Sequence, residues 1–250
     1  MNIAINNFLR GYLPVSLMET EGAALLNRVD VKYLLPLQQL PALLADMQQA
    51  YKVLEIDGAR AMDYTTWYYD SADFRLYLDH HNGYVNRIKV RQRRYETTGD
   101  CFFEIKRKIN ETRTEKKRVK IPALHYSLSV AEQQMIQYPH LRGQPAAFKL
   151  CNRFNRITLC DADAAERVTI DTGISMEVEG KSQSLESIAL IEVKQRHTSR
   201  ASPCIARLRQ MHVVSTTFSK YAVGAALLYA GLKHNNFKPV LNNILKYGSK

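Results

Sequence analysis

Residues 87–95 read RIKVRQRRY, and every second side chain from Arg87 to Arg93 is basic. Successive side chains of a β-strand point to opposite faces, so one face carries Ile88 and Val90 and the other carries Arg87, Lys89, Arg91 and Arg93. Same-face neighbours lie about 6.8 Å apart, and at an effective dielectric of ~20 each adjacent pair costs roughly 2.4 kcal/mol before salt screening. Such a row is most easily accommodated opposite a polyanion.

The same alternation recurs along the chain. The expected charged faces are Arg28, Asp30 and Lys32; Glu104, Lys106 and Lys108; Lys116, Arg118 and Lys120; Arg167, Thr169 and Asp171; and Glu192, Lys194 and Arg196. The positions between them are mostly apolar. An ordinary antiparallel sheet with one solvated face also alternates, but such a face usually mixes the signs of its charges. We therefore predict an α+β fold: an antiparallel β-barrel tunnel with a charged lumen, and helices packed against its apolar exterior.

Composition narrows the class of protein. The chain has 250 residues, 46% of them hydrophobic, and a net charge of +11, which is typical of a globular protein with an anionic partner. No apolar run reaches the roughly 18 residues of a membrane span, and the N-terminus lacks a signal-peptide pattern. We expect a cytoplasmic protein. The four cysteines form no CxxC pair, so neither structural zinc nor a disulfide framework is indicated.

The remaining elements follow from periodicity and capping signals. We expect helices at 37–51, 129–138, 202–212 and 217–232, a short helical turn at 74–78, and strands at 65–69 and 148–159. The tail after His234 is polar and is expected to be partly mobile. No linker stands out, so we predict one domain over 1–250, with a core at 28–232, a helical extension at 1–27 and a tail at 233–250.

A charged lumen restricts the ligand. A barrel of about eight strands is only side-chain wide, which excludes duplex nucleic acid but admits a linear phosphate chain. Glu104 and Glu192 each precede a lysine by two residues and suit a divalent cation that bridges phosphates, although they could equally balance the lysines. No P-loop or GxGxxG motif occurs. His80 and His81 lie in a turn-like context and are expected to be exposed without a role.

These residues resemble a known family, the catalytic domain of the vacuolar transporter chaperone (VTC) polyphosphate polymerases, within the CYTH or triphosphate-tunnel group. The standalone bacterial form is the more similar one. The matching segments are RVDVKYLL at 28–35, TTWYYD at 65–70, RIKVRQRRY at 87–95, FFEIKRK at 102–108, RFNRITL at 153–159, ERVTIDTGI at 166–174, IEVKQRH at 191–197 and STTFSKYAVG at 215–224. Their order along the chain is the order that the family has.

The resemblance implies a set of site residues. The catalytic residues would be Lys32, Arg91 and Arg93, which line the tunnel, and Glu192, which would hold Mn²⁺ or Mg²⁺ with assistance from Glu104. Further phosphate-binding positions are Lys106, Arg156, Arg167 and Lys220, and the charged faces add Lys89 and Lys194. Two positions are ambiguous in the motif: Lys117 competes with Arg118, which strand parity favours, and Arg153 competes with Arg156.

The resemblance implies a metal-dependent polyphosphate polymerase that transfers the terminal phosphoryl group of ATP, or of another nucleoside triphosphate, to a growing polyphosphate chain. Two departures weaken that reading: Arg28-x-Asp30-x-Lys32 replaces the ExExK opening of many tunnel enzymes, and Thr217 stands where eukaryotic polymerases carry a second lysine. The alternatives are a triphosphate or tripolyphosphate hydrolase and a non-catalytic binder. Nucleic acid is not expected as a partner, because aromatic residues cluster at 65–69 rather than alternating with basic ones. A membrane partner remains open.

Overall fold

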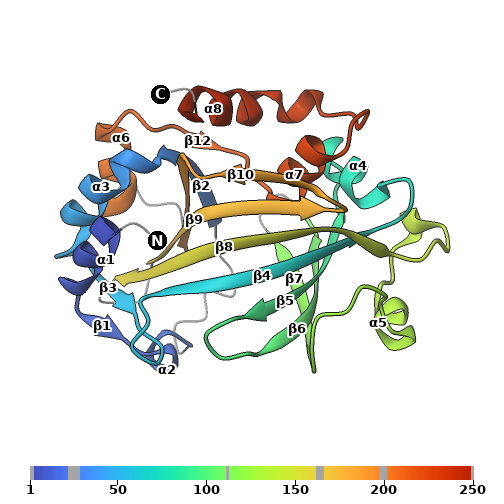
Figure 1. Ribbon diagram of the computed structural model, residues 1–250, viewed down its shortest axis with the longest axis horizontal. Coiled ribbons are helices and arrows are strands. Elements are labelled where there is room, and N and C mark those ends of the chain that lie inside the picture. Colours follow the sequence, from blue (N-terminus) through green and yellow to red (C-terminus); the bar gives the residue numbers. More distant parts are fainter. Residues whose placement is uncertain (1–2, 22–28, 111–112, 162–165, 197–201, 249–250) are drawn as a thin grey trace.

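The computed structural model describes residues 3–21, 29–110, 113–161, 166–196 and 202–248, and Arg28 lies outside them. Their dominant feature is a large antiparallel sheet flanked by helices, so the α+β expectation is confirmed (Figure 1). The strand order is β12-β2-β11-β9-β8-β4-β5-β6-β7. Within the described residues the ladder does not join β7 to β12, so backbone pairing does not close the sheet into a barrel.

The nine strands of this ladder have the following bounds. They are β2 (Val29–Pro36), β4 (Ala61–Asp70), β5 (Ile88–Tyr95), β6 (Cys101–Lys108), β7 (Thr114–Ile121), β8 (Ala147–Asp161), β9 (Glu166–Val178), β11 (Ile188–Gln195) and β12 (Ser215–Thr216). The short β1 (Pro14–Val15) pairs with β3 (Tyr51–Leu54), and β10 (Lys181–Leu185) pairs with β9. The alternation did not predict β3 or β10. Gly180 lies in the turn between β9 and β10 with a φ of +78°, a backbone conformation that glycine adopts without strain.

Strand register confirms that the charged side chains share one face. Residues that pair directly across neighbouring strands point the same way, and Arg91 pairs with Glu104 while Glu192 pairs with Lys32. We call this the inner face, because the sheet curves around it. Lys32 on β2 and Lys89 on β5 both reach residues 218–219: Lys32 Nζ donates to the carbonyl oxygen of Phe218 (3.0 Å) and Lys89 Nζ to Ser219 Oγ (3.0 Å).

The outer face is apolar and covered by helices in two areas, as predicted, while Lys117 of β7 and Arg153 of β8 lie on it uncovered. On one side, α1 (Ile3–Arg10), α3 (Leu40–Met47) and α6 (Pro203–Gln210) pack over β2, β8, β9 and β11 (Figure 1). On the other side, α4 (Arg75–His81), α5 (Val130–Met135) and η2 (Pro139–Leu141) pack over β5 and β6. The remaining N-terminal elements are α2 (Leu17–Glu21) and η1 (Leu37–Gln39). The capping box at the start of α5 and the Ser202 cap of α6 are both present, as the sequence indicates.

Helix α7 (Lys220–Leu228) corrects the expectation that every helix lies outside. It packs on the inner face, where Tyr221 stacks on Tyr68 with ring centroids 5.2 Å apart. Gly224 permits this close approach, because a Cβ there would lie 2.9 Å from Met176 Sδ. The inner face is therefore charged at one end and apolar beneath α7, where buried aromatic and aliphatic side chains favour contact with a helix.

The C-terminal segment corrects a second expectation. Residues 235–248 form η3 (Asn235–Phe237) and α8 (Lys238–Gly248) instead of a mobile tail, with Val240 and Ile244 buried against the core. The sequence appears polar because the apolar positions of α8 are spaced by a helical turn, and only one side of this helix is buried. Among the described residues, no helix combines the length and hydrophobicity that crossing a bilayer requires.

Candidate anion-binding site

Glu104 is the most enclosed carboxylate of the inner face, with a side chain that is 0% exposed. Arg91 contacts its Oε2 from Nε (2.6 Å), Lys116 is ion-paired with Oε1, and Arg118 Nε lies 3.7 Å from Oε1. Burial alone would raise the pKa of Glu104, but Arg91 and the other cations hold it well below its ordinary value. Glu104 is therefore a charged counter-ion shared by neighbouring strands.

Asp171 forms a second buried network at the start of α7. Arg156 forms a bidentate ion pair with Asp171, with Nε 2.5 Å from Oδ1 and a terminal nitrogen 2.7 Å from Oδ2. Lys220 is ion-paired with Oδ2 of the same carboxylate. The cations keep the pKa of Asp171 low against the opposing effect of burial. Burial lowers the pKa of Lys220 to about 7, partly opposed by Asp171 and reinforced by Arg156. With this pKa, the Lys220 amine would lose its proton, and its charge, near neutral pH.

Glu192 belongs to a third, more open group. Lys194 Nζ lies 2.8 Å from its Oε2, Lys32 Nζ lies 3.6 Å from its Oε1, and the Glu192 side chain keeps 19% of its surface exposed. Burial would raise the pKa of Glu192, but Lys194 and Lys32 hold it well below the ordinary value. An ionised carboxylate is therefore available at the edge of a cavity.

Lys89, Lys106 and Arg93 have no carboxylate within ion-pair distance in the described part of the chain. Lys89 bonds to Ser219, and Arg93 Nε donates to Thr66 Oγ1 (3.1 Å). Burial lowers the pKa of Lys89 and of Lys106 well below the ordinary value, and nearby cations, Lys32 for the first and Arg91 for the second, act in the same direction. An anion beside them would remove this repulsion.

A cavity of about 450 Å³ lies beside Lys32, Lys89, Lys106 and Glu192; the Glu104 and Asp171 networks and Arg93 are not part of its lining. Its basic wall, as we name it, comes from β2, β5, β6 and the residue before β5, and consists of Lys32, Arg87, Lys89, Lys106 and Lys108. Its neutral wall comes from α4, α7 and the C-terminal segment, and consists of His80, His81, Val223, Asn236, Phe237 and Val240. Glu192 and Asp30 also line the cavity, as do Thr114 and residues 216–219.

His80 and His81 correct the expectation that these residues are exposed and idle. His81 is buried, and His80 is half-buried with its Nδ1 accepting a hydrogen bond from Arg87 Nε (3.1 Å). Burial, together with Lys89 and Arg87, lowers the pKa of His80 to about 2. His80 is therefore a neutral imidazole in the cavity. The sequence did not predict the burial of His80, because the residues that pack against it, such as Phe237, lie far away in the chain.

The structure also places the other predicted residues. Arg156 and Arg118 are on the inner face, whereas their competitors Arg153 and Lys117 lie on the outer face, Arg153 being paired with the exposed Glu177. Arg167 is on the inner face at the far end of β9, and donates to the carbonyl oxygen of Thr20 (2.6 Å). These placements agree with strand parity, while the roles of the residues stay predictions.

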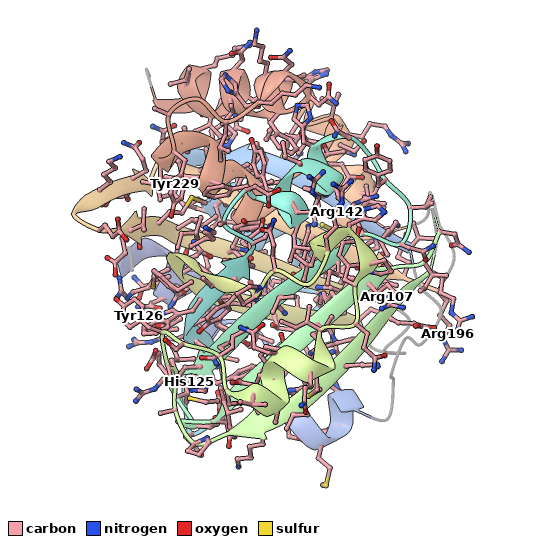
Figure 2. The ribbon with its side chains drawn as sticks, turned by 90° about the vertical axis from the view of Figure 1, so that its right-hand side faces the viewer. Arg107, His125, Tyr126, Arg142, Arg196 and Tyr229 are labelled. Carbon is pink, nitrogen blue, oxygen red and sulfur yellow. The ribbon has the colours of Figure 1, made fainter. Side chains whose placement is uncertain are left out.

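Two further side chains depart from the expected pattern. Arg196 follows the end of β11 and is exposed at the surface rather than on the inner face (Figure 2). Asp171 and Lys116 belong to the charged alternation, yet neither was assigned to the site, although both complete its ion pairs. Strand parity placed them on the correct face; only the contacts between strands reveal their partners.

The two carboxylates proposed as metal ligands differ in their fitness for that role. A divalent cation in a phosphate site is commonly held by one or two carboxylates together with phosphate oxygens and water. Glu192 fits, because it lines the cavity and remains partly exposed. Glu104 does not fit, because it is fully buried and already shared by cations. The described residues contain no cluster of three or more His, Cys, Asp or Glu side chains suited to a metal.

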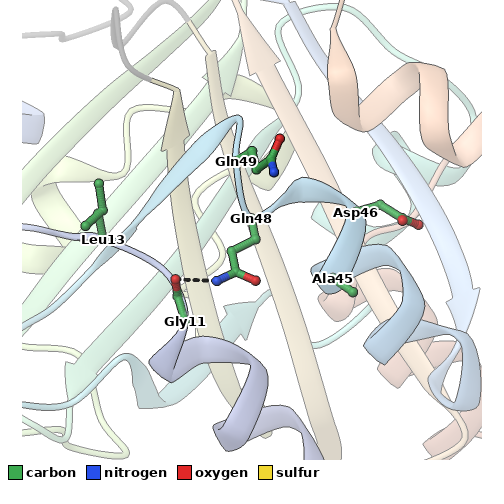
Figure 3. Close-up of a pocket in the computed structure, with 6 residues that line it drawn as sticks. All are labelled: Gly11, Leu13, Ala45, Asp46, Gln48 and Gln49. Carbon is green, nitrogen blue, oxygen red and sulfur yellow. Dashed lines mark hydrogen bonds between the residues drawn. The ribbon is translucent and has the colours of Figure 1, made fainter.

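Other hollows lack this chemistry. A surface pocket of about 560 Å³ lies between the end of α1 and the end of α3, where the Gln48 amide donates to the Gly11 carbonyl oxygen (Figure 3). It has no basic side chain in its lining, and Asp46 is its charged group. A third pocket, of about 400 Å³, lies beside α5 and is lined without charged side chains. The cavity on the inner face is therefore the candidate site.

Fold and site define a class of protein: an α+β protein whose curved antiparallel sheet encloses a basic cavity suited to phosphate groups. Comparison with known families makes this more specific. The chain belongs to the VTC domain family, whose model matches residues 27–229. The resemblance read from the sequence is thereby confirmed. A search of curated proteins finds no match.

Solved structures with a similar arrangement were also found. A putative adenylate cyclase from Vibrio parahaemolyticus is 16% identical, with a TM-score of 0.45, and the match covers 79% of this chain and 97% of that one. A putative adenylyl cyclase from Hippeastrum, described as revealing a dominant triphosphatase activity, is 15% identical with a TM-score of 0.49 and coverage of 84% and 100%. The family assignment rests on the VTC domain match.

Proposed function

We propose that this protein is a metal-dependent polyphosphate polymerase that uses ATP as the phosphoryl donor. The observation that carries the proposal is the unbalanced positive charge at the cavity: Lys89 and Lys106 are partly buried, lack a carboxylate within ion-pair distance among the described residues, and lie near other cations. A triphosphate supplies the missing negative charge. In this proposal the curved sheet acts as a tunnel for the phosphate chain.

The basic residues position the donor and stabilise charge. Lys32, Arg91 and Arg93 hold the triphosphate in line with the acceptor, and the remaining inner-face cations neutralise charge on the equatorial oxygens. Lys89, Lys106, Arg118, Arg156, Arg167, Lys194 and Lys220 form that remaining set. A terminal phosphate oxygen of the acceptor chain attacks the γ-phosphorus, the bond to the β-phosphate oxygen breaks, and ADP leaves. No general base is required, because the attacking oxygen is already an anion.

Glu192 would hold the divalent cation, Mn²⁺ or Mg²⁺, and Glu104 would keep Arg91 and its neighbours in place. Held there, the cation would neutralise part of the charge on the phosphate oxygens. Glu192 is suited to this role because Lys194 and Lys32 keep it ionised. The cytoplasmic location and a membrane partner stay predictions, as does the single-domain organisation.

A hydrolase on the same scaffold is the second candidate, since water could replace the acceptor phosphate in the same cavity. A non-catalytic triphosphate binder is the third. Incubation of the purified protein with ATP and Mn²⁺, followed by ³¹P NMR and gel analysis, separates the three. We expect a growing internal-phosphate signal with release of ADP. Orthophosphate without chain growth would instead identify a hydrolase, and thermal stabilisation by triphosphate without turnover would identify a binder.

Arg91→Ala and Lys32→Ala provide the mutational test of the same proposal. We expect each variant to lose turnover while remaining folded, as judged by circular dichroism. Arg153→Ala is the matched control, because Arg153 lies on the outer face and pairs with the exposed Glu177. Wild-type activity in Arg91→Ala or Lys32→Ala would show that the chemistry lies elsewhere.

A further inference from the structure

The cavity has two chemically different sides. Its basic wall suits phosphate, but its neutral wall has two imidazoles, an amide and apolar side chains, and none of its residues is Lys, Arg, Asp or Glu. A ligand made only of phosphate would gain little from such a wall, because every phosphate oxygen needs a cation or a hydrogen-bond donor. The neutral wall therefore indicates a ligand with an uncharged part beside its phosphates.

The side chains of the neutral wall pack against one another and against the core. The ring of His80 stacks on Phe237 with centroids 5.7 Å apart and an interplanar angle of 30°. Val223, Phe237 and Val240 belong to one buried apolar cluster. These apolar residues are themselves buried and reach the cavity only with small areas, so they form an apolar lining that suits contact with a heterocyclic base.

Polar groups on this wall have fixed orientations. The backbone N–H of Asn236 donates to His81 Nε2 (3.2 Å), and its side-chain Nδ2 donates to the carbonyl oxygen of His81 (2.8 Å). Because Nδ2 makes this bond, the amide oxygen of the exposed Asn236 is the side-chain atom that can accept a hydrogen bond from a ligand. His80 accepts from Arg87 at Nδ1, so its proton resides on Nε2, which can donate to a hydroxyl or phosphate oxygen.

Much of this wall lies outside the family match. The VTC domain covers residues 27–229, whereas Asn236, Phe237 and Val240 come from η3 and α8, which follow it. Figure 1 shows α8 lying along one side of the sheet, beyond α7. The C-terminal segment thus adds groups to a phosphate site that the family domain supplies.

We propose that residues 236–240, together with His80 and His81, form a nucleoside subsite that receives the base and ribose of a nucleoside triphosphate whose phosphates lie on the basic wall. The proposal rests on the proposed function for the choice of a nucleotide donor. It makes this site selective for a nucleotide over a plain phosphate chain. Asn236 is a specificity-determining residue in this arrangement.

Isothermal titration calorimetry with two ligands tests the subsite. The probes are the β,γ-imido analogue of ATP and tripolyphosphate, each with Mg²⁺, so no turnover is needed. We expect Asn236→Ala to bind the ATP analogue about three- to tenfold more weakly, the loss of one hydrogen bond, and to bind tripolyphosphate within twofold of wild type. Asn235→Ala is the control, because Asn235 is exposed and does not line the cavity. Equal effects on both ligands, or no effect on either, would overturn the subsite.

A comparison on the unmodified protein covers the case in which Asn236→Ala fails to fold. Wild-type protein should bind ATP analogue at least about fivefold more tightly than ribose triphosphate, which has the phosphates but no base. Equal affinity would overturn the nucleoside subsite while leaving the phosphate site intact. Lys89→Ala separates the two hypotheses, because it should weaken both ligands; if it weakens neither, the phosphate site itself is wrong.

Discussion

Two charged regions of the inner face differ in how completely their cations are balanced. Around Glu104, Arg91 and Lys116 share a buried carboxylate, and the ion pairs join neighbouring strands. At the cavity, Lys89 and Lys106 have no such partner among the described residues, and burial lowers their pKa values. The strands of both regions show the same alternation of charged and apolar residues. The difference indicates that the charges around Glu104 also join neighbouring strands, whereas Lys89 and Lys106 are left for a ligand.

Removing the counter-ion should have the largest effect. Glu104→Gln leaves the largely buried Arg91 beside the more exposed Lys116 and Arg118 without a carboxylate, so we expect the free energy of unfolding to fall by about 3–5 kcal/mol. Chemical denaturation measures this loss. The control is Glu177→Gln, which breaks the exposed pair with Arg153 and should cost under about 1 kcal/mol. Equal losses in the two variants would show that Glu104 is no more structural than a surface carboxylate.

Removing an unbalanced cation should have the opposite signature. In Lys106→Met we expect tripolyphosphate to bind about 10- to 100-fold more weakly, because a charge-assisted contact is lost, while stability without ligand is unchanged or higher. Lys117→Met is the matched control on β7, since Lys117 is exposed and points to the outer face. Calorimetry and thermal unfolding provide the two readouts. Loss of stability together with retained binding would reverse the comparison.

Removing the open carboxylate should affect the metal. We expect Glu192→Gln to bind tripolyphosphate about tenfold more weakly with Mn²⁺ present, and with unchanged or tighter affinity when the metal is chelated, because Glu192 also neutralises Lys194 and Lys32. Titrations with and without EDTA distinguish the two. A loss that is equal in both conditions would assign Glu192 to charge balance alone.

Lys220 should give the smallest and most specific effect. Its folded pKa is about 7, against an unfolded value of about 10.4, so between these values the unfolded chain holds a proton that the folded chain lacks, and stability should rise with pH in that window. An anion nearby raises the Lys220 pKa, so triphosphate binding at pH 8 should take up a proton. Lys220→Arg stays charged and should take up less, measured by calorimetry in buffers of different ionisation enthalpy. Equal proton uptake in the two proteins would show that Lys220 does not titrate.

The sequence predicted which side chains lie on the inner face, but not which of them contact one another. Alternation in residues 87–95 assigns Arg91 and Arg93 to one face, and the structure confirms it. It could not tell that Arg91 meets Glu104 while Arg93 meets Thr66, since that depends on the register of strands far apart in the chain. The same limit applies to α7, whose placement on the inner face depends on Tyr68, Tyr221 and Met176 meeting from different elements.

What the sequence by itself determined is the class of site: basic side chains every second residue define a strand face whatever the surrounding fold, because backbone geometry imposes a period of two. The family assignment likewise follows from motifs in the chain. Tertiary structure decided which cations are balanced, which carboxylate is open, and that His80 and Asn236 share a cavity. The physical reason is that burial and charge balance depend on neighbours brought together by folding, and sequence spacing does not fix those distances.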